Sequence, residues 1–161
     1  MNIEFELDYL SLLVAADKSR ELANEAIILG LNKSAREVQA IARAKHRFRS
    51  SPKANLEKSI EYEVDAAKME ATVSPTESVA PYALFVHEGT KPHQILPRAK
   101  KALRWASGGK FVFAKGVWHP GTQKDQFLYE AGETALPKIN QIFSHAVADL
   151  VAQLNRQVGG A

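Results

Sequence analysis

The stretch that decides the fold is SRELANEAIILGLNKSAREVQAIARAKH at residues 19–46, where apolar residues recur at the spacing of an amphipathic helix. At 1.5 Å per residue a helix of this span is about 40 Å long, which is long for a small domain. Gly30 lies inside the pattern, and we expect it to bend the helix at most. We also expect Asp17 or Ser19 to cap the start of this helix, downstream of a separate start at Tyr9.

A strand pattern follows this helix. Ile60, Tyr62 and Val64 alternate with acidic residues, which is typical of a strand with one buried face. We expect this strand to pair with residues 69–73 across a turn at residues 65–68. These residues therefore supply the first antiparallel pair of the predicted sheet.

The second half of the chain contains a further hairpin pattern and a further helix pattern. Two β-prone runs on either side of Gly108 and Gly109 predict a β-hairpin over residues 99–118. Apolar residues from Ile139 onward hold helical spacing, and Pro137 suits the first turn of that helix because a missing N–H costs little there. The predicted fold class is α+β: an antiparallel sheet with a long N-terminal-half helix and a C-terminal helix packed on it.

Length and composition fit one globular domain. The 161 residues predict a single domain over 1–161, and 45% hydrophobic with 24% charged residues is an ordinary globular composition. The alternation of apolar and polar residues at the N-terminus predicts a strand or an arm over 1–7. The Gly159–Gly160 pair predicts a flexible tail over 156–161.

Several classes of protein are excluded by what the sequence lacks. With no cysteine, the chain forms neither a disulfide framework nor a thiolate metal site, so we expect a reducing compartment or indifference to redox. No apolar run approaches the ~18–20 residues of a membrane span, so no membrane association is expected. A secretory signal begins with basic residues, whereas the first residues of this sequence include Glu4, Glu6 and Asp8, so no such signal is expected. The sequence contains no nucleophile elbow and no phosphate-binding loop.

Three histidines in the Gly/Pro-rich centre are the candidates for chemistry. His87, His93 and His119 together could ligate zinc, but no two of them have the paired spacing of a helical zinc site, and Glu88 is the one nearby carboxylate that stands out. A small hydrolase or toxin that uses His87, Glu88 and His119 is a weaker alternative. We therefore expect a protein that is not an enzyme, with no catalytic residue, no metal site and no cofactor.

The net charge of +3 conceals a strong segregation of charge along the sequence. Residues 59–90 carry one basic and six acidic groups, whereas residues 91–119 carry seven basic groups and no acidic one. Such asymmetry suggests a polyanion nearby, or acidic and basic faces that meet between copies of the protein; two solvated faces are the plain alternative. The candidate residues for contact with DNA or a neighbouring subunit are Lys91, Arg98, Lys100, Lys101, Arg104, Lys110 and Lys115.

Aromatic residues are interleaved with this basic segment at Trp105, Phe111, Phe113 and Trp118. Basic and aromatic side chains together can hold a single nucleic-acid strand by charge and stacking. The interpretation that we favour places these aromatics in the core, because eight of the 13 aromatic residues lie between residues 82 and 129. If the basic groups do meet nucleic acid, we expect sequence-independent contact with phosphates and not base recognition.

Six ordered segments carry a resemblance to a known family. The segments are YALFVHEGT at 82–90, PHQILP at 92–97, KALRW at 101–105, FVFAK at 111–115, HPGT at 119–122 and QFLYEA at 126–131. In this order they resemble the neck, or tail-completion, proteins of the head–tail joining module of tailed bacteriophages. The resemblance covers residues 82–131 and extends loosely over the long helix before them.

The chain departs from the pattern of that family at two places. Gln126 stands where relatives have a proline before Phe127. Upstream, SPKANL at residues 51–56 resembles a Pro-x-x-Thr-Gly-x-Leu element, with Ala54 and Asn55 in place of the Thr-Gly pair. We expect the turn at this upstream element to differ from that of the relatives.

The resemblance implies a structural role without catalysis. Members of that family resemble small α+β domains that form rings around the DNA passage between head and tail, commonly rings of six, with twelve as the alternative. The residues that match the motifs are Tyr82, Gly89, Thr90, Pro97, His119, Pro120, Gly121, Phe127 and Leu128. Gly89 and Gly121 suit positions where the backbone turns sharply or takes a positive φ.

The resemblance also implies a location and a set of partners. The protein would be a virion component of the neck, present in the host cytoplasm during assembly. Its partners would be other copies of itself, the head–tail connector, and the tail terminator or tube proteins. Ring contacts are head-to-tail, so the acidic and basic blocks would supply complementary faces. Sequence-independent contact of the basic segment with genomic DNA, as a nucleic-acid-binding module, is the alternative.

Overall fold

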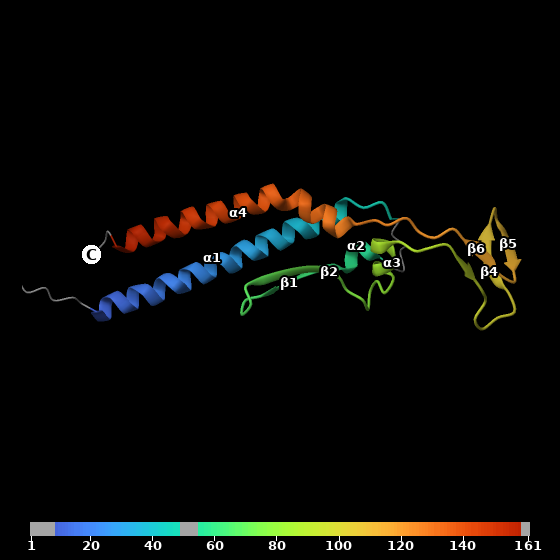
Figure 1. Cartoon of the computed structure of the whole chain (residues 1–161), viewed down its shortest axis with the longest axis horizontal. Helices are drawn as coiled ribbons and strands as arrows, with labels where there is room; N and C mark the ends of the chain where they lie inside the picture. The colour runs from blue at the N-terminus through green and yellow to red at the C-terminus, as the bar shows by residue number, and fades with distance from the viewer. Residues whose placement is uncertain (1–8, 49–54, 159–161) are drawn as a thin grey trace, which may run out of the picture.

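The molecule is elongated along two long helices that lie side by side (Figure 1). The computed structural model describes residues 9–48 and 55–158. The first and last described residues lie toward one end of the molecule, and the strands between residues 93 and 119 lie at the opposite end. The strand or arm expected over 1–7 lies outside the described residues.

Helix α1 (Tyr9–Ala44) is continuous over 36 residues. The second start expected at Asp17 or Ser19 is therefore wrong, and Asp17 instead forms a surface ion pair with Arg20 at 3.2 Å. Gly30 is buried in this helix, and a β-carbon built on it would lie 2.7 Å from Cε1 of Phe143 on the last helix. Gly30 thus lets the two long helices approach closely, which is a packing role that helix propensity does not reveal.

The last helix, α4 (Phe127–Val158), begins well before Pro137, so the proline lies in its interior and not in its first turn. That prediction is wrong because it rests on the apolar pattern from Ile139 onward, whereas the buried face already begins at Phe127. Pro137 removes one N–H from the helix ladder, and Figure 1 shows α4 changing direction in its first half. Since the helix continues to Val158, the first part of the tail expected over 156–161 is helical.

Strands β1 (Ile60–Asp65) and β2 (Glu70–Pro75) form the antiparallel hairpin that their alternation predicts. The register pairs Tyr62 with Val73, and the half-buried face that contains them packs on α1. The opposite face of the hairpin is polar and points to solvent. Alternation alone therefore determines which side of this hairpin lies on the helix.

Two side chains of α1 fix where this hairpin begins. Gln39 and Arg43 both donate to the backbone carbonyl of Ile60, at 2.9 and 2.6 Å. Ile60 itself is fully buried. The carbonyl at the start of the strand thus has two donors from the helix, which ties sheet and helix together at the edge of the core.

The remaining strands form two further antiparallel pairs. Strand β3 (His93–Ile95) pairs with β6 (Val117–His119), and β4 (Leu103–Ser107) pairs with β5 (Lys110–Ala114). Each of the three sheets in the described residues has two strands. The α+β class is confirmed, with the long N-terminal-half helix and the C-terminal helix packed on one another and the strands gathered into small hairpins.

Two short helices connect these parts. Helix α2 (Leu56–Ser59) begins after Asn55, whose side chain accepts the backbone N–H of Lys58 at 3.1 Å. Helix α3 (Ala83–Glu88) ends at Gly89, where φ is +73°. None of the described helices has the length and hydrophobicity that a membrane span requires.

The core lies where the C-terminal end of α1 meets the beginning of α4. Phe127, Leu56 and Ile60 are the largest fully buried hydrophobic side chains, and alanines of α1, α3 and α4 complete the cluster. This corrects the expectation that the aromatic residues between 82 and 129 form the core. Of those eight, Phe127 alone is fully buried, and the aromatics of the basic segment are exposed: Trp105, Phe111, Phe113 and Trp118.

Asp125 fastens the end of α1 to the beginning of α4. Its buried carboxylate accepts the backbone N–H groups of Arg47 at 2.6 Å and Phe48 at 3.0 Å, just beyond the end of α1. Its own backbone N–H donates to the carbonyl of Val86 on α3 at 3.0 Å. An ion pair between Arg47 and Glu130 at 2.7 Å lies beside this junction on the surface. One residue therefore connects three helices.

We predict that alanine at two helical glycines, Gly132 and Gly30, changes the stability of the protein differently. Gly132→Ala should raise the free energy of unfolding by about 1 kcal/mol, because alanine favours the helix and no atom lies within 4 Å of the new β-carbon. Gly30→Ala should lose this gain, because its β-carbon pushes against the Phe143 ring. Urea denaturation measures both changes. Equal stabilisation by the two variants would contradict close packing at Gly30.

We predict that Asp125→Ala lowers the free energy of unfolding by about 3 kcal/mol, because two backbone N–H groups lose a charged acceptor. Asp125→Asn should cost less, since its carbonyl oxygen can accept both. The control is Asp149→Ala, at an exposed position of α4 without an ion pair among the described residues, which should change stability by less than about 0.5 kcal/mol. Thermal and urea denaturation check the ranking. An Asp125→Ala variant as stable as the Asp149→Ala control would contradict the role of this carboxylate.

Candidate interaction surface on the hairpin arm

The segment from Thr90 to Thr122, here called the arm, leaves the body and returns to it at one point. Thr90 and Thr122 form an isolated antiparallel bridge, in which each backbone N–H donates to the carbonyl of the other at 2.9 and 3.1 Å. The Thr90 hydroxyl also accepts the N–H of Thr122 at 2.9 Å. The strands β3 to β6 all lie beyond this bridge, at the end of the molecule away from the chain ends (Figure 1).

Two glycines make this close approach feasible. Gly89 has φ of +73° and Gly121 has φ of +91°, so the backbone takes a positive φ at both, one of the two conformations expected there. A β-carbon on Gly121 would lie 2.2 Å from the carbonyl oxygen of Thr90, and one on Gly89 would lie 2.6 Å from that of Thr122. The arm therefore requires glycine at both positions, for conformation and for space.

The first pair of strands in the arm carries two of the three central histidines. His93 lies opposite His119 in the register of β3 and β6, with the ring centres 5.2 Å apart. The Nδ1 of His93 donates to the carbonyl of Lys91, and the Nδ1 of His119 accepts the N–H of Gly121. Both imidazoles therefore support turns of the backbone at the root of the arm.

The second pair of strands presents two different faces. Arg104 shares one face with Phe111 and Phe113, and its guanidinium carbon lies 4.4 Å from the centre of the Phe111 ring. Trp105 and Val112 lie on the other face. The exposed fraction is 62% for Phe111 and 66% for Phe113, and both Trp105 and Val112 are also exposed. Neither face of this hairpin is covered by the described parts of the chain.

The arm also carries seven exposed cations. All seven basic residues predicted to contact DNA or a neighbouring subunit are exposed, and none has an ion-pair partner in the part of the chain that the structure describes. The arm contains no acidic residue to neutralise them. They are Lys91, Arg98, Lys100, Lys101, Arg104, Lys110 and Lys115. The arm is thus a cationic surface with apolar patches, which is typical of an interaction surface.

The residues of the family-like motifs fall into two groups. One group gathers at the root of the arm and consists of Gly89, Thr90, His119, Pro120 and Gly121. The other group belongs to the core or packs against it and consists of Tyr82, Phe127 and Leu128. Pro97 lies outside both groups, half-buried between β3 and β4. Most of these residues therefore belong to the root of the arm or to the core that supports it.

The histidines do not assemble into one reactive centre. His87 on α3 packs against the rings of Phe127 and Tyr129, and its Nδ1 lies 2.8 Å from a carboxylate oxygen of Glu88. Among the described residues 9–48 and 55–158, no hydrogen bond joins His87 or Glu88 to His119. Within the same ranges, no three His, Asp or Glu side chains come together as metal ligands would.

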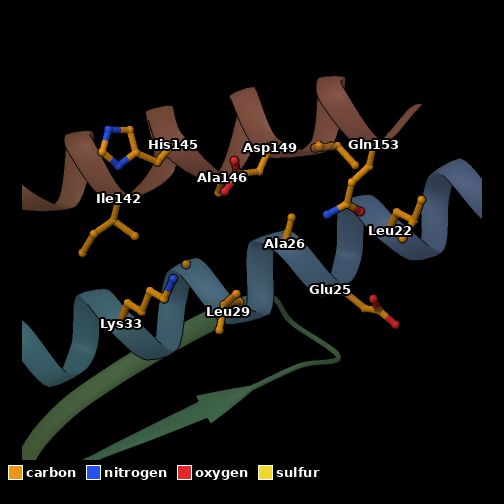
Figure 2. Close-up of a pocket in the computed structure, with 12 residues that line it drawn as sticks. Leu22, Glu25, Ala26, Leu29, Lys33, Ile142, His145, Ala146, Asp149 and Gln153 are labelled. Carbon is orange, nitrogen blue, oxygen red and sulfur yellow. The ribbon is translucent and has the colours of Figure 1, made fainter. Parts of the chain in front are cut away.

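A groove of about 260 Å³ lies between α1 and α4, away from the arm (Figure 2). Apolar residues such as Ala26 and Ile142 line its floor, and Glu25, Lys33, His145 and Asp149 lie around it. None of these four charged or titratable side chains forms an ion pair within the described residues. The groove is the open seam between two helices, with polar and apolar side chains of both helices along it.

Two structural features were not singled out from the sequence. Asp125 belongs to no motif. It lies two residues before the first residue of α4, where the neighbouring sequence indicates only a helix cap. The alternate positions of Glu61 and Glu63 in the sequence indicate the acidic outer face of β1 and β2. The number of charges in residues 59–90 does not, because it gives the charge of a segment and not the side of the strand on which the charges lie.

No protein-family model matches the chain, and neither a curated protein nor a solved structure is significantly similar to it. The arm is therefore identified by its own geometry, exposure and charge. The resemblance to head–tail joining proteins stays a prediction from the sequence.

We predict that Gly121→Ala opens the root of the arm, at a cost of about 2 kcal/mol or more in local stability, because the new β-carbon meets the Thr90 carbonyl at a positive φ. The matched control is Gly108→Ala at the tip, where φ is +56° but no atom lies within 4 Å. Hydrogen exchange of the Thr90 and Thr122 amides measures the opening. Unchanged protection of both amides in Gly121→Ala would contradict this role.

Proposed function

We propose that the chain is a structural virion protein of a tailed phage: a neck or tail-completion component that forms a ring at the head–tail interface and joins the tail to the head. The observation that carries the proposal is the arm, which presents cations and aromatic rings to solvent without cover from the described chain. The six ordered motif segments suggest the family, and the arm supplies a physical reason for assembly.

The surface of the isolated chain supports association. Its solvent-accessible area is 12755 Å². A compact monomer of 17.7 kDa exposes about 7,900 Å² by the scaling of surface with mass. Assembly with neighbours would cover part of the excess.

The hairpin of β4 and β5 also supports association. A two-stranded hairpin is marginally stable in water unless another element covers one of its faces. Here Trp105 and Val112 are exposed on one face, and Phe111 and Phe113 on the other. A neighbouring subunit of the ring would supply the missing cover, so folding of the arm and assembly would reinforce each other.

In this proposal the protein acts by binding and positioning. Copies of the chain, six in the expected ring and twelve in the alternative, contact one another through complementary faces. The ring lies between the head–tail connector and the tail terminator or tube proteins, around the passage for the genome. No residue is assigned a catalytic role, and no cofactor is needed.

Nucleic-acid binding by the same arm is the second candidate, and one contact favours it. The guanidinium of Arg104 stacks on Phe111, and the exposed Phe113 lies on the same face. A cation beside aromatic rings is the arrangement that holds single strands by charge and stacking. In that case the arm would meet the phosphates of the genome without reading its sequence.

A stop codon in this gene, in a phage that carries it, tests the first proposal. We expect DNA-filled heads and complete tails that remain separate under electron microscopy, because the component that joins them is missing. Purified full-length protein added to the lysate should restore joined, infectious particles, and native mass spectrometry of that protein should show a ring. Joined particles in the absence of the protein would contradict the proposal.

A further inference from the structure

The outer face of the β1–β2 hairpin is a second charged surface, opposite in sign to the arm. The register sets three carboxylates of β1 on the side away from α1, and Glu70 of β2 joins them. Within this hairpin the one cation is Lys68, whose ammonium lies 3.2 Å from Asp65. The backbone N–H and the ammonium of Lys68 hold the pKa of Asp65 below its usual value, so this carboxylate stays ionised.

This acidic face is not balanced within its own hairpin. Asp65 lies directly opposite Glu70 in the register, and like charges at paired positions of two strands repel. Beside them is a shallow hollow of about 160 Å³, lined by Glu63, Asp65, Lys68, Glu70 and Thr72. A cationic side chain from a partner would relieve the repulsion and fill the hollow.

The arm of the same chain lies elsewhere. Figure 1 shows the β1–β2 hairpin alongside α1, whereas β4 and β5 lie at the far end of the molecule beyond the Thr90–Thr122 bridge. The seven cations of the arm, and the carboxylates of Glu61, Glu63 and Glu70 on the sheet, therefore have no ion-pair partner among the described residues. Two copies arranged head to tail would bring the two surfaces together.

The arm is better suited to a protein partner than to nucleic acid. Phosphate contact uses cations and leaves the second face of a hairpin open to water. Here both faces carry large apolar side chains, with Trp105 and Val112 on one and Phe111 and Phe113 on the other. A folded partner with carboxylates and an apolar surface can contact both the cations and the apolar side chains of the arm. A strand of DNA contacts mainly the cations.

We infer that the arm of one copy seats on the outer face of the β1–β2 hairpin of the next copy. This inference rests on the proposed ring and names the contact that closes it. The carboxylates around the hollow receive cations of the arm, and the aromatic side chains of β4 and β5 lie against the body of the neighbour. Because each copy has one arm and one acidic face, the contact repeats from copy to copy.

Two charge reversals in the full-length protein test this contact. The arm variant carries Lys100→Glu, Lys101→Glu and Arg104→Glu, and the sheet variant carries Glu61→Lys, Glu63→Lys and Glu70→Lys. The arm variant lowers the charge of the arm from +7 to +1, and the sheet variant turns the sheet face from acidic to basic, so we expect self-association in sedimentation velocity to weaken about tenfold or more in each. In a 1:1 mixture the unchanged arm of the sheet variant meets the unchanged sheet face of the arm variant, so association of the two variants in pairs should return.

A third variant controls for net charge. Lys18→Glu, Arg36→Glu and Lys138→Glu change the total charge as much as the arm variant does, at exposed positions of the two long helices. This control should associate like the wild type. Circular dichroism should show the same helical content in all variants. Added salt should weaken association of the wild type, because the contact is largely electrostatic.

The outcomes separate this contact from the proposed function. Loss of association in each reversal and its return in the mixture support the contact. If both reversed variants form rings like the wild type, or if the mixture stays dissociated, the contact is wrong while the ring stands. If the wild type does not associate at any concentration and is absent from virions, both proposals fail. An arm variant that assembles normally but loses salt-dependent DNA binding overturns the contact in favour of nucleic acid.

Discussion

The buried carboxylate of Asp125 is the interaction on which the rest of the structure depends. It accepts two backbone N–H groups beyond the end of α1, while its own backbone is bound to α3 and leads into α4. The long helices α1 and α4, the short helix α3 and the root of the arm therefore meet around Asp125. The core with Phe127, Leu56 and Ile60 lies at the same junction, so the charged hydrogen bonds of Asp125 add to apolar packing there.

Much of the fold could be predicted from periodic patterns. The period of two in Ile60, Tyr62 and Val64 located both strands of the first hairpin and the face that packs on α1. The position of Pro137 was predicted wrongly, because local rules prefer a proline in a first turn, whereas α4 accommodates it at the bend. The role of Gly30 depends on Phe143 of another helix, which no local pattern contains.

The candidate site was predictable in its charge but not in its exposure. Counting charges located the basic segment, and the positive φ of Gly89 and Gly121 could be expected from the turns around them. The aromatics of the arm were expected in the core, because an isolated domain normally buries such residues. Their exposure supports the proposal that a neighbouring copy covers them. Membership of the head–tail joining family stays a prediction.

The root of the arm has a mechanical consequence. One bridge makes fewer contacts than a packed interface does, so we expect the arm to pivot at this joint more easily than the long helices bend. In the proposed ring, its angle would then adjust to the neighbour on which it rests. Neighbouring bodies can then differ slightly in tilt without straining the long helices, and misfit in an assembly is absorbed at the joint.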